Sequence, residues 1–135
     1  MINMAVTVKN TTIAKLNTDQ TLTANVATST VAGAPEVFTY TPKAATGKVA
    51  LIFQSSSTGT VPATYSIAAG DLWAAGAITG TIGSTTAAKA TEVVEIETAK
   101  VLQNNGTIAI TVSPGSSTLK LKDNHTFTMY ALELL

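Results

Sequence analysis

The chain has 135 residues and no net charge at pH 7, with 45% hydrophobic but only 12% charged residues. This charged share is about half of what soluble domains usually carry. The eight basic residues are all lysines and are scattered, so the clustered cations needed to neutralise phosphates are missing and we expect no nucleic-acid partner. The absence of cysteine excludes disulfides and thiolate metal sites. Low charge with abundant Thr, Val and Ala predicts a β-rich domain with a neutral, hydroxyl-covered surface.

The N-terminal residues lack the basic stretch and apolar core of a secretory signal. No apolar run approaches the ~20 residues of a membrane span. We therefore expect a protein made in the cytoplasm, with no membrane partner.

Residues 1–33 are rich in Thr, Ala and Asn, and their short alternating stretches indicate edge strands or a tethering arm. Met4, Val6 and Val8 occupy every second position of the first stretch and are candidates for contact with a partner protein. The first firm break falls at residues 31–35, where Gly33 and Pro35 stand. We expect residues 34–135 to form a single β-sandwich domain.

The most apolar run of the chain is Val-Ala-Leu-Ile-Phe at residues 49–53, bounded by Gly47 and by a Ser/Thr/Gly segment at 55–59. Its length suits a strand, and a strand without a polar face must be covered on both sides or lie centrally in a sheet. We predict the central strand here, with Val49, Leu51, Ile52 and Phe53 in the core.

Further β-prone stretches, most of them alternating and most separated by Gly, Pro, Asn or Ser, are expected as strands at residues 36–41, 61–67, 78–83, 91–98, 107–112, 119–122 and 126–135. For the stretch at 91–98, the alternative is a helix over 91–103, but the β-branched residues Val93, Val94 and Ile96 argue against a helix. The pattern predicts an all-β fold of about eight to ten short strands. It is typical of an antiparallel β-sandwich, a jelly roll or a Greek-key barrel, among which the sequence does not decide.

No pattern of catalytic or cofactor-binding residues is present, so we expect neither an enzyme nor a cofactor. His125 is the only histidine and follows Asp123 and Asn124, which favours a role in a turn over a catalytic or zinc-binding one. Glu95 and Glu97 share one strand face, so their spacing is possible for the two catalytic carboxyl groups of a glycosidase. The nearby lysines instead favour a strand face that is simply exposed to solvent. We therefore predict no metal site.

Trp73 is the only tryptophan and stands among small residues in a segment bounded by Gly70 and Gly76. Tryptophan is favoured at the energetic centres of interfaces, so Trp73, with Leu72 and Asp71, is our candidate subunit interface. A sugar-stacking role for Trp73 and the three tyrosines is the less favoured alternative, because a small sandwich needs most of its few aromatic residues inside.

Several features, taken in order, carry a resemblance to a known family. They are Phe-Thr-Tyr-Thr-Pro (38–42) leading into Gly-Lys-Val-Ala-Leu-Ile-Phe (47–53), Ala-Ala-Gly-Asp (68–71) with Trp73, Glu-Ile-Glu-Thr-Ala-Lys-Val-Leu-Gln (95–103) running into Asn-Gly-Thr-Ile (105–108), and Tyr-Ala-Leu-Glu-Leu (130–134). This order resembles that of the capsid decoration, or cement, proteins of tailed bacteriophages. Residues 1–33 take no part in the resemblance, and the 116–126 segment is an addition to it.

The resemblance implies a non-enzymatic β-domain that binds the outer face of the mature capsid, often as a homotrimer. It implies the major capsid protein as partner and the virion exterior as location, with Met4, Val6 and Val8 as the capsid-contacting arm. Two alternatives stay open: another β-sandwich structural module, such as a phage fibre, tail or surface-adhesion domain, and a carbohydrate-binding module. The carbohydrate-binding alternative predicts exposed aromatic residues in a plane on one face.

Overall fold

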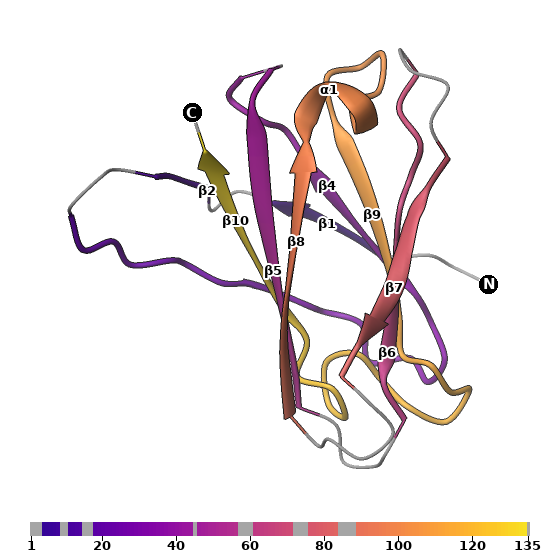
Figure 1. Cartoon of the computed structure of the whole chain (residues 1–135). Coiled ribbons are helices and arrows are strands. Elements are labelled where there is room, and N and C mark those ends of the chain that lie inside the picture. Colours follow the sequence, from indigo (N-terminus) through magenta and orange to yellow (C-terminus); the bar gives the residue numbers. More distant parts are fainter. Residues whose placement is uncertain are drawn as a thin grey trace.

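The computed structural model describes residues 4–8, 11–14, 18–44, 46–56, 61–71, 76–83 and 89–134. These residues form two facing β-sheets and one helical turn, α1 (Thr98–Val101) (Figure 1). The first sheet has the order β1 (Met4–Val8), β4 (Glu36–Tyr40), β9 (Ile108–Ser113), β6 (Ala63–Ile67), β7 (Ile78–Ile82). The second has the order β2 (Thr11–Ile13), β10 (Thr128–Leu134), β5 (Lys48–Ser56), β8 (Lys89–Glu97), and β3 (Asn25–Val26) pairs with β10. The predicted all-β class is confirmed, and the two layers make it a sandwich.

The core lies between the two sheets and is filled mainly by alternate residues of the central strands, as the two-residue period of a strand requires. Every second side chain of β4, β9, β5 and β10 is buried. The ring of Phe127 joins the layers, because it packs edge-on against Phe38 at 5.5 Å between centroids and lies 5.9 Å from Phe53. Burial of these aromatic side chains removes a large apolar area from water and stabilises the fold.

The apolar run at 49–53 lies in β5, which has β10 on one side and β8 on the other. Val49, Leu51 and Phe53 point into the core and are buried. Ile52, which we expected beside them, points to the outer face and is only half-buried. The expectation for Ile52 was wrong because successive side chains of a strand alternate between faces, even in a fully apolar run.

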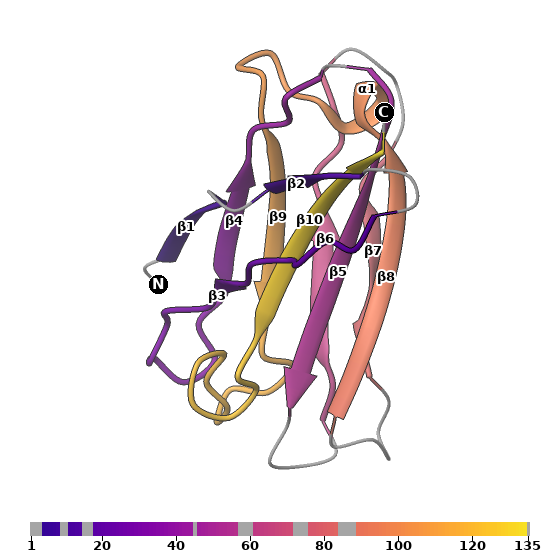
Figure 2. The ribbon, with the colours of Figure 1, turned by 90° about the vertical axis from the view of Figure 1, so that its left-hand side faces the viewer.

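The N-terminal residues supply edge strands to both sheets. β1 pairs with β4 and β2 pairs with β10, and both pairings are parallel, unlike the antiparallel pairings of the other strands. After β2, residues 18–24 project from the sandwich in Figure 1 and cross in front of β5 and β10 in Figure 2. We call residues 18–24 the arm; Met4, Val6 and Val8, the capsid-contacting residues that the resemblance implies, lie outside it in β1. Gln20 ties the arm to the end of β2, because its Nε2 donates to the Ile13 carbonyl at 2.7 Å.

The expectation of a strand at 119–122 was wrong, because this stretch belongs to a series of turns. The backbone N–H of Lys120 donates to Asn124 Oδ1 at 2.7 Å, and the Lys120 carbonyl accepts from the N–H groups of Asn124 and His125. These local bonds replace the ladder of a strand, as Asn side chains often do. Leu121 is fully buried at the centre of the turns and anchors them to the core.

Candidate functional site: a polar groove on the outer sheet face

His125 has a structural role. Its ring is fully buried, with Nε2 2.7 Å from the Pro114 carbonyl and Nδ1 3.0 Å from Ser55 Oγ. A carbonyl oxygen only accepts, so Nε2 carries a proton that it donates to Pro114, and Nδ1 is hydrogen-bonded to the Ser55 hydroxyl. Both ring nitrogens are therefore engaged in holding the turns before β10 against β5, and both the ring and Ser55 are buried.

Glu95 and Glu97, together with Glu92 of the same strand, lie on the surface of β8. Glu95 pairs with Lys48 at 3.4 Å and Glu97 with Lys100 at 3.5 Å, and all four side chains of these ion pairs are about half exposed. Glu92 is also exposed. Within the described part of the chain, no three His, Asp or Glu residues gather closely enough to hold a metal ion.

Two other carboxylates, Glu36 and Glu133, are buried in the sandwich. Oε1 of Glu36 accepts the backbone N–H groups of Thr28, at 2.8 Å, and Ser29. Oε1 of Glu133 accepts the Tyr40 hydroxyl and, at 2.6 Å, the backbone N–H of Lys43. Each glutamate thus ties a connecting segment to a strand. The signal for them was present in the sequence, since both stand in phase with the apolar, core-facing residues of their strands.

The proposed subunit interface is described only at Asp71. Oδ2 of Asp71 accepts the Asn104 N–H at 2.7 Å, and its own N–H donates to the Leu102 carbonyl at 3.2 Å, so this exposed residue connects two loops. Leu72 and Trp73 lie outside the described residues, as do the side chains of Met4, Val6 and Val8.

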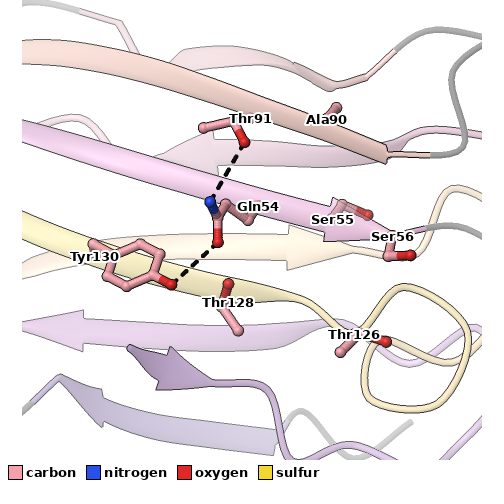
Figure 3. A pocket seen from close by; sticks show the side chains of 8 residues that line it. All are labelled: Gln54, Ser55, Ser56, Ala90, Thr91, Thr126, Thr128 and Tyr130. Atoms are coloured by element: carbon pink, nitrogen blue, oxygen red, sulfur yellow. Dashed lines mark hydrogen bonds between the residues drawn. The ribbon is translucent and has the colours of Figure 1, made fainter. Parts of the chain in front are cut away.

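A groove of about 510 Å³ opens on the outer face of the second sheet, at the end where β5 finishes (Figure 3). Three neighbouring strands and the turn before β10 contribute to it. The described residues that line it are Gln54, Ser55, Ser56, Ala90, Thr91, Thr126, Thr128 and Tyr130. Six of these eight carry a hydroxyl, one carries an amide, and none carries a charge. Its volume is within the range of small-molecule sites.

The centre of the groove is a polar row that crosses three strands. The pairing register places Thr128 of β10 beside Gln54 of β5, and Gln54 beside Thr91 of β8. The Tyr130 hydroxyl donates to Gln54 Oε1 at 3.1 Å, and Gln54 Nε2 lies 3.5 Å from Thr91 Oγ1, as Figure 3 shows. The Tyr130 bond holds the Gln54 amide in one orientation, with its NH₂ group directed toward Thr91.

The next row along the same face is apolar. It contains Tyr130, Ile52 and Val93, which the register aligns across β10, β5 and β8. The side chain of Val93 is 62% exposed, the largest exposure among the large hydrophobic residues that the structure describes. The face therefore changes within one row from hydroxyl and amide groups to aromatic and aliphatic groups.

Thr126, at the end of the groove, has a strained backbone. Its φ is +46°, and it is the only non-glycine residue with positive φ among those described. Both neighbours are fully buried: His125 is held by two hydrogen bonds, and Phe127 packs in the core. Thr126 itself is exposed. A β-branched residue in this region costs about 1–3 kcal/mol, and such strain is concentrated at functional sites.

The sequence did not predict this groove. Gln54, Thr91 and Thr128 are outward-facing polar residues of three separate strands, and only the long-range register brings them together. The aromatic plane expected of a carbohydrate-binding module is not formed by the described tyrosines. Tyr40 is buried, Tyr65 packs against Phe53 with 5.0 Å between ring centroids, and Tyr130 alone lines the groove.

No protein-family model, curated protein or solved structure matches this chain. The fold and the groove define its class as an all-β sandwich with a hollow on one sheet face whose described lining is uncharged and rich in hydroxyls. In the described part, no helix combines the length and the apolar character needed to cross a membrane.

Proposed function

We propose that the chain is a virion structural protein that binds the outer surface of a bacteriophage capsid and stabilises the mature head. The major capsid protein would be its partner, and a homotrimer its expected assembly. The role requires no chemistry, so we propose no enzymatic activity. The resemblance in the sequence motivates this proposal, and the all-β sandwich is compatible with it.

The arm is the structural observation that carries the proposal. It projects from the sandwich in Figure 1, and Thr18, Asp19, Gln20 and Thr21 are all exposed. Exposed side chains on an extended segment of this kind can enter pockets of a neighbouring protein, which is how such segments are recognised when they bind to another sheet. β1, which contains Met4, Val6 and Val8, is a second candidate surface, because it is the last strand of its sheet and an added strand could pair with its outer edge.

Linkage explains how such binding would stabilise a capsid. A protein that binds the assembled shell, and not its dissociated subunits, shifts the equilibrium toward the shell by mass action. Many copies on one particle multiply a modest contact energy. A net charge of zero limits electrostatic repulsion between neighbouring copies.

The test is co-sedimentation of the purified protein with expanded shells of the major capsid protein, alongside its detection on intact virions. We expect wild-type protein to pellet with the shells, and Thr21→Lys, in the arm, to weaken the binding about tenfold. Thr81→Lys is the matched control, since Thr81 is exposed on β7 of the other sheet. A protein absent from virions, or one that stays in the supernatant, would overturn the proposal. Labelling on the tail instead of the head would favour a fibre or tail module.

A further inference from the structure

We propose that the groove formed by β10, β5 and β8 binds a neutral saccharide. This inference is independent of the capsid role, because it rests on the lining of the groove and not on the arm. It assigns a ligand class to the end of the sheet face where Gln54, Thr128 and Tyr130 meet (Figure 3).

The hydrogen-bonding groups of the lining match those of a sugar. Each sugar hydroxyl donates one hydrogen bond and accepts others, so its best partners are groups that do both. The Thr91, Thr126 and Thr128 hydroxyls are such groups, and Gln54 presents a donor and an acceptor on one planar amide. Gln54 occupies the middle of the row, and its orientation is already fixed by the Tyr130 hydroxyl at 3.1 Å. A group fixed in advance loses less side-chain entropy on binding.

The neutral lining discriminates between classes of ligand. A phosphate or a carboxylate needs a cation or several converging N–H groups, and a metal ion needs carboxylates. The described lining contains neither Lys nor Asp nor Glu. A neutral polyol meets no unpaired charge among these described residues, and its hydroxyls replace the water that their side chains lose.

The apolar row beside the polar one matches the second property of a sugar. A pyranose ring has C–H groups on its faces and hydroxyls around its rim, so it is amphipathic in the same sense as this sheet face. Tyr130 joins the two rows, since its ring belongs to the apolar row with Ile52 and its hydroxyl reaches Gln54. Amphipathic Tyr side chains are well suited to such contacts. A groove of about 510 Å³ is large enough for one or two sugar rings.

The experiment is an NMR titration of the whole ¹⁵N-labelled chain with defined probes. The probes are the methyl glycosides of glucose, galactose, mannose and N-acetylglucosamine, together with maltose, cellobiose, lactose and N,N′-diacetylchitobiose. We expect at least one of them to cause saturable shifts of the Gln54, Thr91 and Thr128 amide signals, with a Kd of about 1 mM for so small a ligand.

Variants then locate the site. Gln54→Ala removes the central amide and is expected to raise the Kd about tenfold, the effect of one lost hydrogen bond of ordinary strength. Thr91→Val removes a hydroxyl from the same polar row, in the exposed edge strand β8. This variant locates the site if Gln54→Ala does not fold. Thr79→Ala, which removes an exposed Thr side chain from β7 in the other sheet, is the matched control and should leave the Kd unchanged.

Two results would overturn the inference. One is the absence of saturable shifts with every probe at about 50 mM, well above the expected Kd. The other is saccharide binding that Gln54→Ala and Thr91→Val both leave unchanged, which would place the site elsewhere. Neither result bears on co-sedimentation with capsids, so failure here and failure of the capsid proposal are distinguishable.

Discussion

The side chains of Ser55 and His125 join β5 to the turns before β10, with 3.0 Å between Ser55 Oγ and His125 Nδ1. Both residues are buried, and the other ring nitrogen of His125 lies 2.7 Å from the Pro114 carbonyl. The backbone repeats the connection, because the Ser56 N–H donates to the His125 carbonyl. This link fixes the position of Thr126, the next residue, at the end of the groove.

Ser55→Ala is expected to lower the free energy of unfolding by about 1–3 kcal/mol, because it leaves the buried Nδ1 of His125 without a partner. Chemical denaturation measures the change. Ser56→Ala is the control, since the adjacent hydroxyl is only half-buried, and it should stay within about 0.5 kcal/mol of wild type. Equal stabilities for the two variants would show that the Ser55–His125 bond contributes nothing.

Glu133→Ala is expected to destabilise the fold by about 3 kcal/mol or more. The substitution leaves the Tyr40 hydroxyl and the Lys43 N–H without the oxygen that accepts both of them in a buried site. Thermal unfolding and denaturant titration check the loss. Glu133→Gln keeps one acceptor oxygen and should lose less.

A double-mutant cycle assigns this effect to a particular contact. Tyr40→Phe and Glu133→Ala should be non-additive, because each removes the same hydrogen bond. Glu97→Gln is the control for loss of a carboxylate, since Glu97 is exposed and paired only with Lys100 on the surface. Additive losses at positions 40 and 133 would contradict the contact.

The sequence predicts the parts of this fold that follow from local patterns. Alternation located β4 and β9, and five consecutive apolar residues located β5 as a central strand. The turns at 119–125 escaped prediction because Leu119 and Leu121 alternate like a strand, while the Asn124 side chain closes the backbone on itself. The groove escaped prediction for another reason. Gln54, Thr91 and Thr128 become neighbours only through a register that depends on the whole sheet.

Leu51→Asp is expected to unfold the domain. Leu51 is fully buried in β5, and an unpaired carboxylate at this position would cost more than the roughly 5–15 kcal/mol that stabilises a typical domain. Ile52→Asp is the matched control, because the next side chain points to the outer face. It should lose about 2 kcal/mol and remain folded. Circular dichroism and solubility separate the two outcomes, and a folded Leu51→Asp protein would mean that the core is wrongly placed.

Thr126→Asn is expected to stabilise the protein. Thr126 has φ of +46°, a region that a β-branched side chain disfavours and that Asn tolerates several-fold better. A gain of about 0.5–1 kcal/mol should raise the Tm by roughly 2–4 °C in a domain of this size. Thr30→Asn is the control, since Thr30 is exposed in a loop and does not have a positive φ, so the same change should bring no gain there. A Tm for Thr126→Asn at or below that of wild type would show that the Thr126 backbone is not strained.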